Sequence, residues 1–294
     1  MVGLGRMGFG MAERLLKNKI RVVVYNRSVD KIKKIVGKGA VGSVSLEDLV
    51  KKLPSGKKIV WLMLPAGEVT EQTIRVLLKL LRPGDIIVDG ANDFYGVAEK
   101  HSALCSQQGI HFFDCGVSGG VWGLKNGFTL MVGGAKGQFK FIEPICKALA
   151  PRGGYAYFGP AGAGHFVKSV HNIIEYVYLQ GLAEGVELLR RFKQPIDLAK
   201  VTTVWEPASV IRSWLLGLTT TALRRSDFKK ISAKIDSVTI DELQKTVRSV
   251  EGYAPAFGAA VKIRRDKSQQ FVFGKRTIAA VRREFGGHAV VKKK

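Results

Sequence analysis

Cysteine, histidine and acidic residues are scarce in this chain, and each scarcity excludes a class of protein. The three cysteines, Cys105, Cys115 and Cys146, form no C-x-x-C pair, so we expect neither a disulfide framework nor a cysteine-rich zinc site. Reduced thiols are typical of a cytoplasmic protein, which is the location we expect. The five histidines show no metal-ligand spacing, so we expect no bound metal.

Long apolar runs are also missing. No apolar run in the chain approaches the roughly 18 residues that a membrane-spanning helix requires. The chain opens on a glycine motif and not on a signal peptide, so we expect no membrane partner. With 294 residues, 46% of them hydrophobic, it can bury a sizeable core in one large or two ordinary domains.

The 24 acidic residues are outnumbered by 47 basic ones, which gives a formal net charge of +23. Such a charge suits a nucleic-acid partner or anionic phosphate ligands. The basic residues are spread along the chain, with one terminal run at residues 292–294, and no zinc finger or basic-aromatic RNA-binding signature accompanies them. We therefore do not expect a nucleic-acid partner. The non-enzymatic alternative is a basic protein that binds nucleic acid and has no catalytic activity.

Glycine is abundant where the chain opens. Gly3, Gly5 and Gly8 form G-x-G-x-x-G, followed by a helical pattern at residues 11–18. Glycines at this spacing permit a tight turn and the close approach of a pyrophosphate to backbone N–H groups at a helix N-terminus. The motif predicts a dinucleotide-binding loop. Only two residues precede Gly3, so we expect either that the first strand of such a fold is a stub or that several native N-terminal residues are missing from this sequence.

A buried strand is predicted at residues 21–27. It ends about 20 residues after the glycine loop, where the residue that contacts the cofactor ribose belongs. NAD-specific sites carry an acidic residue there, whereas this chain has Asn26, Arg27 and Ser28. A guanidinium suits a 2′-phosphate by its charge and its planar hydrogen-bonding fork. The sequence therefore favours NADP, with NAD as the alternative cofactor.

Further α/β units follow. Helical segments such as residues 69–81 separate strands predicted at residues 58–65, 85–92, 109–120, 128–134 and 154–159. This alternation predicts an α/β fold with a Rossmann-type, doubly wound, mostly parallel sheet that binds ligands outside the carboxyl ends of its strands. After residue 160 the pattern turns helical. We expect an NAD(P)-binding Rossmann-like domain at residues 1–160 and an all-α domain for substrate binding and dimerisation at residues 161–294.

Within the helical part, residues 164–185 read GHFVKSVHNIIEYVYLQGLAEG. Polar and charged side chains recur at i, i+3, i+4, i+7 and i+8, a spacing that places them on one face of an α-helix. They are Lys168, His171, Asn172, Glu175 and Tyr176. The remaining faces are apolar, which predicts a buried helix. Burying charge is costly unless the charge is paired or used, so the stripe favours a functional site over a solvated face.

Six segments carry a resemblance to a known family: GLGRMG, DGAN, GVSGGVWGLKNG, GAGHFVKSVHNIIEY, SVIRSW and REFGGH. Together they resemble the decarboxylating 6-phosphogluconate dehydrogenases in their short form, within the β-hydroxyacid dehydrogenase superfamily. The resemblance runs from Gly3 to about Lys294. The related 3-hydroxyisobutyrate-type dehydrogenases carry Lys-x-x-Asn-Asn on this helix and lack the later His-Asn-x-x-Glu-Tyr and Phe-Gly-Gly-His features.

The resemblance implies roles for individual residues. Lys168 matches the catalytic lysine and Glu175 the catalytic glutamate. Substrate contacts are implied at Asn92, Ser118, Gly119, Gly120, His171, Asn172, Tyr176, Arg212, Arg282 and His288. Cofactor contacts are expected at Gly3, Leu4, Gly5, Arg6, Met7, Gly8, Asn26, Arg27, Ser28, Leu64, Pro65 and Asn92.

Some implied contacts concern the phosphate and the assembly. Tyr176, Arg212 and Arg282 match phosphate contacts of the family, and Arg283 leaves an alternative register beside Arg282. In the family, residues matching Arg282 and His288 reach the neighbouring subunit's site. The resemblance therefore implies a homodimer or homotetramer with shared active sites.

The implied activity is the oxidative decarboxylation of 6-phosphogluconate to ribulose 5-phosphate and CO₂ with reduction of NADP, a step of the pentose phosphate pathway. A non-decarboxylating β-hydroxyacid dehydrogenase of the 3-hydroxyisobutyrate type is the second enzymatic alternative. Glu175 and the phosphate contacts at Arg212 and Arg282 disfavour that alternative.

One segment departs from the family pattern. Short-form relatives carry a glycine-rich loop with a basic residue after Asp-Ser, whereas here Asp236 and Ser237 run directly into VTIDELQ. The loop is predicted to be deleted, together with one phosphate contact worth about 1.5–3 kcal/mol. We expect weaker substrate binding, or replacement of that interaction by a nearby basic residue such as Lys234.

Overall fold

In the computed structural model, which describes residues 1–235 and 239–292, the chain divides into two compact units. The first unit is Met1–Val170 and the second is His171–Lys294. Helix α8 (Ala163–Arg190) contributes residues to both. Within the described residues, no helix is both long enough and apolar enough to cross a membrane.

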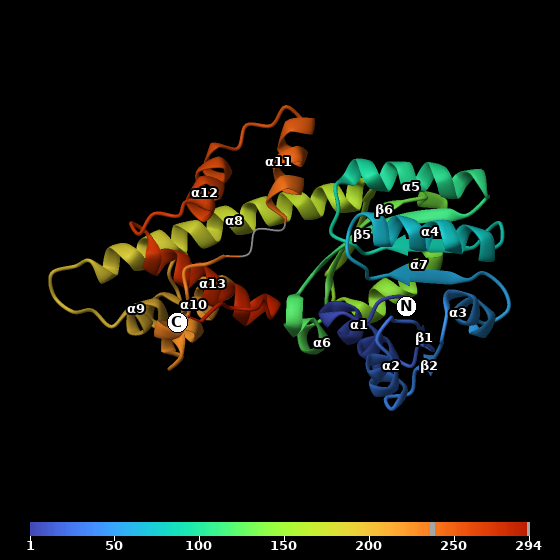
Figure 1. The fold of residues 1–294 in the computed structure, drawn as a ribbon, viewed down its shortest axis with the longest axis horizontal. Helices are drawn as coiled ribbons and strands as arrows, with labels where there is room; N and C mark the ends of the chain where they lie inside the picture. Colours follow the sequence, from blue (N-terminus) through green and yellow to red (C-terminus); the bar gives the residue numbers. More distant parts are fainter. Residues whose placement is uncertain (236–238, 293–294) are drawn as a thin grey trace. The chain divides into compact units, whose positions relative to one another are not determined.

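The first unit alternates strands and helices (Figure 1). Its strands are β1 (Val23–Val24), β2 (Val41–Gly42), β3 (Ile59–Leu62), β4 (Ile86–Asp89), β5 (His111–Ser118), β6 (Thr129–Gly134) and β7 (Tyr155–Gly159). Its helices are α1 (Arg6–Lys17), α2 (Val29–Val36), α3 (Leu46–Lys52), α4 (Glu68–Leu80), α5 (Tyr95–Gln107), α6 (Gly123–Asn126) and α7 (Phe139–Leu149). Short 3-10 turns lie at Gly120–Trp122 and Lys136–Gln138.

The main sheet has the order β3-β4-β5-β6-β7. Its strands are parallel except for the antiparallel pair β5 and β6, so the predicted, mostly parallel sheet is confirmed. The connection from Ser118 to Thr129 contains only turns and the short helix α6. It reverses the chain direction, so that β6 runs antiparallel beside β5. A parallel return would have needed a longer crossover.

Val2 takes the place of the first strand. It forms isolated bridges to Tyr25 and to Leu62. Its N–H donates to the carbonyl of Trp61 and its carbonyl accepts from Met63, both at 2.8 Å. This one residue therefore links the parallel pair β1–β2 to the main sheet.

The strand predicted at residues 21–27 is wrong in length. Only Val23 and Val24 pair with β2, and Tyr25 pairs with Val2 instead. Because both neighbours of this strand are short, the backbone beyond Tyr25 has no ladder partner and turns away towards α2. Local apolar composition could not reveal how short those neighbours are.

Two apolar cores lie on opposite faces of the sheet, which confirms the doubly wound arrangement. One is built from α1, α2 and α7, and the other from α3, α4 and α5. On β4, Ile86 and Val88 enter the first core and Ile87 enters the second. Such alternation follows from the two-residue period of a strand, and its apolar character on both faces is typical of parallel sheets.

The described part of the second unit is helical, as predicted. It contains α9 (Leu198–Trp205), α10 (Trp214–Arg224), α11 (Ile240–Ser249), α12 (Pro255–Arg265) and α13 (Val272–Gly286), with a 3-10 turn at Phe228–Lys230. Helix α10 packs against α9 and α13. One core includes Leu179 of α8 with Leu218 and Ile278, and a second surrounds Tyr176.

The expectation of a wholly buried α8 is wrong. In the polar stripe, Asn172 is 9% and Tyr176 3% exposed, whereas apolar Ile174 is 62% and Leu188 70% exposed. The helix therefore buries part of its polar stripe and leaves apolar side chains at the surface. Helical spacing identifies faces, but it does not show which face the neighbouring elements cover.

Candidate active site

The glycine loop brings three backbone segments into close contact. Gly3 has φ +92°, and a Cβ there would lie 2.4 Å from the carbonyl oxygen of Met63. A Cβ on Gly8 would lie 2.2 Å from the carbonyl oxygen of Gly3. Gly5, directly before α1, has no heavy atom within 4 Å of the place its Cβ would take, and no side chain caps the helix. The loop therefore fits a pyrophosphate, which would lie over Gly5 against the N-terminus of α1.

Asn26 holds this loop to the end of β1. Its side-chain oxygen accepts a hydrogen bond from the N–H of Leu4 at 2.8 Å, and its amide donates to the carbonyl of Ser28 at 3.2 Å. Arg27 is exposed and forms no hydrogen bond or ion pair with any residue that the structure describes. Asn26 is thus occupied within the protein, whereas the guanidinium of Arg27 is available to a ligand.

The other predicted cofactor residues lie at the same edge of the sheet. Leu64 and Pro65 follow β3, and Asn92 follows β4. The N–H of Gly67 donates to the carboxylate of Asp93 at 3.3 Å and joins these two loops. Since β3 and β4 are parallel, their carboxyl ends meet where an open α/β sheet binds its ligands.

Ser118, Gly119 and Gly120 end β5 at that edge. Gly119 has φ +119° and Gly120 has φ +54°, conformations that favour glycine. A Cβ on Gly119 would lie 3.2 Å from the carbonyl oxygen of Gly127. The backbone here therefore needs both glycines to turn away from the sheet and leave Ser118 at its edge.

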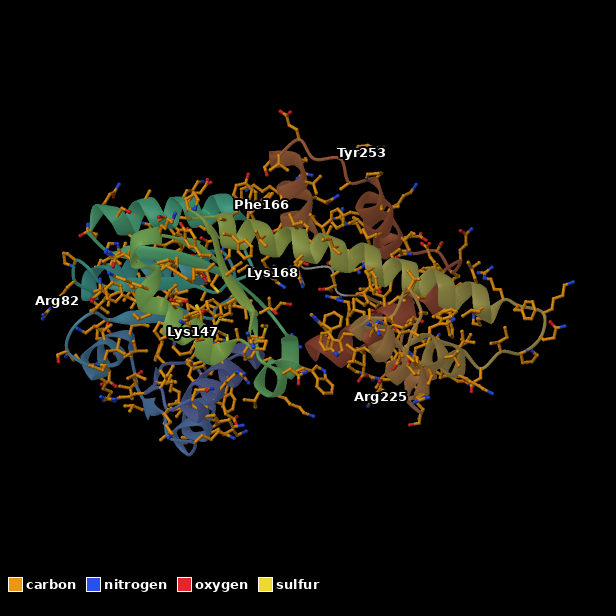
Figure 2. All side chains as sticks on the ribbon, turned by 180° about the vertical axis from the view of Figure 1, so that it is seen from behind. Arg82, Lys147, Phe166, Lys168, Arg225 and Tyr253 are labelled. Atoms are coloured by element: carbon orange, nitrogen blue, oxygen red, sulfur yellow. The ribbon has the colours of Figure 1, made fainter. Side chains whose placement is uncertain are left out.

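Lys168 projects from the second turn of α8 (Figure 2). A Cβ on Gly116 of β5 would lie 2.4 Å from the Cβ of Lys168, and one on Gly164 would lie 2.4 Å from the carbonyl oxygen of Met131. Glycine at both positions lets α8 lie directly against the backbone of β5 and β6. The stem of Lys168 is thereby held beside Gly116, which precedes Ser118 by two residues in β5.

Asp114 anchors the beginning of α8 to β5, and the sequence analysis did not identify it. Its carboxylate is fully buried and accepts from the N–H of Gly162 at 2.8 Å and from that of His165 at 2.7 Å. A carboxylate at a helix N-terminus satisfies unpaired N–H groups and is favoured by the helix dipole. The available signal was an aspartate inside the apolar strand FFDCGV.

In the second unit, the polar stripe of α8 continues with two hydrogen-bonded pairs. Nδ1 of His171 lies 3.1 Å from the side-chain oxygen of Asn172. The hydroxyl of Tyr176 lies 3.0 Å from that of Thr239. Glu175 is half-buried between them in the stripe. The stripe thus presents an imidazole, an amide, a carboxyl and a phenol in fixed order.

Arg282 and its neighbour differ in their surroundings. Arg283 forms two bonds to Asp227, at 2.8 and 3.2 Å, and its guanidinium holds the pKa of that carboxyl below its usual range. Arg282 is buried on α13 and lies near enough to Arg264 to lower its pKa. Because Arg283 is occupied by Asp227, Arg282 is the better ligand-binding candidate.

The remaining predicted site residues lie outside the helices of the second unit. Arg212 is exposed before α10 and donates to the carbonyl of Pro207 at 3.3 Å. His288 follows α13 and packs edge-on to Phe285, with ring centroids 6.1 Å apart. Lys234 is exposed. The predicted deletion at Asp236–Ser237 lies outside the described residues, and in the described ranges no three side chains form a metal-binding group.

Two family descriptions match the chain. Residues 1–159 match the NAD binding domain of 6-phosphogluconate dehydrogenase, and residues 164–249 match the C-terminal domain of the same enzyme. The first match alone covers more than half of the chain.

Two relatives extend this likeness. The Bacillus subtilis protein YqeC, itself named only provisionally as a 6-phosphogluconate dehydrogenase, is 33% identical over 301 residues, covering 100% of this chain and 99% of its own. The NAD(+)-dependent, decarboxylating 6-phosphogluconate dehydrogenase of Haloferax volcanii is 38% identical over 225 residues, covering 76% of this chain and 74% of its own.

Two solved structures share the fold. Plasmodium falciparum 6-phosphogluconate dehydrogenase has a TM-score of 0.78 at 26% identity over 90% of this chain, which spans 60% of that protein's length. Mycobacterium tuberculosis 3-hydroxyisobutyrate dehydrogenase has a TM-score of 0.76 at 22% identity over 96% of this chain and 97% of its own. The family matches and the full-length relative decide the assignment: the chain belongs to the 6-phosphogluconate dehydrogenase family of oxidoreductases.

Proposed function

We propose that this chain catalyses the oxidative decarboxylation of 6-phosphogluconate to ribulose 5-phosphate and CO₂ with reduction of NADP. The observation that carries the proposal is the stripe on α8, where a base, an imidazole, an amide, a carboxyl and a phenol follow one another on one helix face. Residues 1–160 would bind the cofactor and residues 161–294 the substrate.

The nicotinamide, when bound, accepts the hydride from the substrate. The glycine loop would hold the pyrophosphate, with Gly5 left open for it. Arg27 would pair with the 2′-phosphate, because its guanidinium is exposed and has no protein partner among the described residues. This supports NADP, while the Haloferax relative is named for NAD.

Lys168 would act as the base for the 3-hydroxyl group. Its amine must be neutral to take the hydroxyl proton as the hydride leaves C3. The ammonium that results would then polarise the new ketone and stabilise the enolate as the C1–C2 bond breaks and CO₂ departs. Packing of the Lys168 stem against Gly116 supports this role, since it limits the positions that the side-chain amine can reach.

Glu175 would complete the reaction. It lies two turns after Lys168 on the same helix face, and its protonated carboxyl would deliver a proton to the carbon from which CO₂ departed. His171 and Asn172 would orient the substrate hydroxyls, and Tyr176, Arg212 and Arg282 would bind the phosphate. A β-keto acid carries its own electron sink, so these side chains suffice for decarboxylation.

A non-decarboxylating β-hydroxyacid dehydrogenase is the second candidate, favoured by the fold shared with the 3-hydroxyisobutyrate dehydrogenase. The discriminating experiment supplies purified protein with NADP or NAD and either 6-phosphogluconate or 3-hydroxyisobutyrate, and follows reduced nicotinamide and CO₂ together. Reduction with stoichiometric CO₂ from 6-phosphogluconate supports the proposal. Reduction of either cofactor without CO₂ favours the second candidate, and no reduction with either substrate rejects both.

We also infer from the resemblance a homodimer or homotetramer with shared active sites. Arg282 and His288 would then reach the neighbouring subunit's site. Light scattering of the purified protein gives the subunit number.

A further inference from the structure

His165 is a buried imidazole that none of the roles proposed for the active site uses. It lies in the first turn of α8 and is 2% exposed. Its Nε2 lies 3.2 Å from the backbone carbonyl oxygen of Asp89, the last residue of β4. A carbonyl oxygen only accepts hydrogen bonds, so Nε2 carries the proton and donates. The other ring nitrogen, Nδ1, has no hydrogen-bond partner in the described part of the chain, so within that part the ring makes one polar contact.

The backbone of His165 is held by the neighbouring strand. Its N–H donates to the carboxylate of Asp114 in β5 at 2.7 Å, and Asp114 lies directly beside Asp89 in the parallel ladder of β4 and β5. One residue of α8 is thus bonded to two adjacent strands, by its side chain to β4 and by its backbone to β5. A helix held at one point can pivot about it, whereas a second bond to another strand restricts that rotation.

The turn that His165 holds also carries Lys168. The two residues are three positions apart, a spacing that places them on one face of the helix. The helix meets β5 first at Asp114, through the N–H of His165. It meets the same strand again at Gly116, through the stem of Lys168. A rotation of this turn would therefore move the amine of Lys168 as well.

Asp89 also shapes the loop that carries Asn92. Its carboxylate accepts from the N–H of Ala91 at 2.9 Å, which turns the chain directly after β4. Asn92 is the next residue and is predicted to contact substrate and cofactor. Asp89 is 1% exposed and connects two parts of the site, because its carboxylate fixes the Asn92 loop and its carbonyl holds the helix turn.

We propose that His165 is a positioning residue, whose hydrogen bond to Asp89 holds the amine of Lys168 in place relative to Asn92. The proposal rests on the proposed function for the role of Lys168 as the base. Reacting groups must approach to about 3–3.5 Å, and a displacement of about 1 Å can lower a rate about a hundredfold. His165 thus supports the reaction without touching substrate or cofactor.

A second imidazole near Asp89 supplies a matched control. His101 of α5 is 3% exposed, and its Nδ1 lies 3.8 Å from the Asp89 carboxylate, which is too far for a hydrogen bond. Helix α5 carries none of the residues assigned to the site. Replacing His101 therefore removes a buried imidazole from the same region and leaves both bonds of His165 intact.

The test compares His165→Leu, His165→Gln and His101→Leu. For His165→Leu we expect kcat with 6-phosphogluconate to fall roughly 10- to 100-fold, with KM for NADP within about twofold of the wild type. His165→Gln should recover most of kcat, because its side-chain amide can donate to the Asp89 carbonyl. His101→Leu should lower Tm without lowering kcat. Steady-state kinetics well below the Tm of each variant give these values for folded protein.

Three results of these kinetics overturn the inference. The first is a His165→Leu variant with lowered Tm and wild-type kcat, which would show that His165 only stabilises the fold. The second is an equal loss of kcat in His101→Leu, and the third is a His165→Gln variant as slow as His165→Leu. If His165→Leu does not fold, His165→Asn replaces it, because its shorter amide does not reach the Asp89 carbonyl. A wild-type kcat for His165→Asn overturns the inference, and a lowered kcat beside an active His165→Gln supports it.

A second readout does not depend on turnover. Acetic anhydride acetylates neutral amines, and peptide mass spectrometry gives the rate at each lysine. Labelling of Lys168 should become faster in His165→Leu and return to the wild-type rate in His165→Gln, with the exposed Lys79 as internal reference. A wild type that does not turn over 6-phosphogluconate but shows this pattern rejects the proposed function and supports the positioning role. An active wild type whose Lys168 is labelled equally fast in all variants, with unchanged kcat, overturns this inference alone.

Discussion

Lys168 and Arg27 illustrate two ways in which single residues are prepared for a ligand. Lys168 is held by its stem, because the absence of a side chain at Gly116 lets α8 touch β5. Arg27 is left free, because the preceding Asn26 takes over the contact to the glycine loop. In both cases a neighbour without charge determines what the charged residue can do.

Replacing Lys168 with Ala should lower kcat by at least about a hundredfold, the smallest effect common for a general base. The affinity for NADP should stay within about twofold, since a change well below 1.4 kcal/mol is expected for a residue outside the cofactor loop. Stopped-flow turnover and calorimetric NADP titration measure the two effects. Lys79→Ala, an exposed lysine on α4, is the control, and an active Lys168→Ala enzyme would exclude Lys168 as the base.

Replacing Arg27 with Ala should weaken NADP selectively. Loss of a charged hydrogen bond to the 2′-phosphate costs about 1.5–3 kcal/mol, so KM for NADP should rise roughly 10- to 100-fold. KM for NAD should not change, because NAD lacks that phosphate. Parallel kinetics with both cofactors give the ratio, and an equal loss for both would show that Arg27 supports the loop and does not contact the 2′-phosphate.

Among the elements, α8 is tied down at both ends by a buried carboxylate. Asp114 of β5 binds its first turn. Near its other end, Glu187 accepts from Arg190 at 2.7 Å, from Arg191 at 2.9 Å and from the N–H of Gly274 at 3.2 Å. Gly274 lies in the first turn of α13, so Glu187 also caps that helix. Each unit therefore holds its part of α8 by charged hydrogen bonds to backbone N–H groups.

The Glu187 contacts predict a stability that depends on pH. Burial opposes the charged form, but the bonds from Arg190 and Arg191 outweigh it and lower the pKa of Glu187. A lowered pKa means that the carboxylate stabilises the fold above the unfolded value of about 4.3. That contribution disappears as pH falls through the lower folded value.

Replacing Glu187 with Gln should therefore cost about 1–3 kcal/mol near pH 7, and the cost should shrink as the pH falls below about 4.3 and through the lower folded-state pKa. Urea midpoints of the wild type and variant across this range give the difference. Glu184→Gln is the control on the same helix, because Glu184 is exposed and accepts from Gln180. A loss from Glu187→Gln that is equally large at low pH would show that packing, and not charge, is responsible.

For the whole molecule, the resemblance implies active sites that are shared between subunits, with Arg282 of one subunit reaching its neighbour's site. Lys168→Ala and Arg282→Met chains, each impaired alone, should then regain activity when they are unfolded together and refolded as mixed dimers, because statistical mixing restores about a quarter of the sites. A mixture that gives only the average of the two activities would assign Arg282 to its own chain's site.

The net charge of +23 is also a property of the whole molecule. Spread over the surface, it should give weak nucleic-acid binding that is visible near 50 mM salt and absent by about 200 mM. Fluorescence anisotropy with a labelled duplex across this range measures the salt dependence. Tight binding at physiological salt by a protein without turnover would favour the non-catalytic alternative.

Local spacing was sufficient to predict the elements and the faces that carry chemistry. The five strands of the main sheet, the glycine loop and the stripe on α8 were all visible in the sequence, because strand and helix periods depend on residues only a few positions apart. The same periods predicted that the loops after β3, β4 and β5 share one edge of the sheet.

Other features depend on which distant residues meet, and local periods carry no such information. Packing alone decided that Val2 joins two sheets, that Asp114 anchors α8, and that Arg283 is the arginine paired with Asp227. Packing also left Arg264 buried near the end of α12, with its guanidinium carbon 3.4 Å from the centroid of the Tyr176 ring. The sequence thus determined which functional side chains each segment carries. Long-range packing decided which of those side chains bind within the protein and which can bind a ligand.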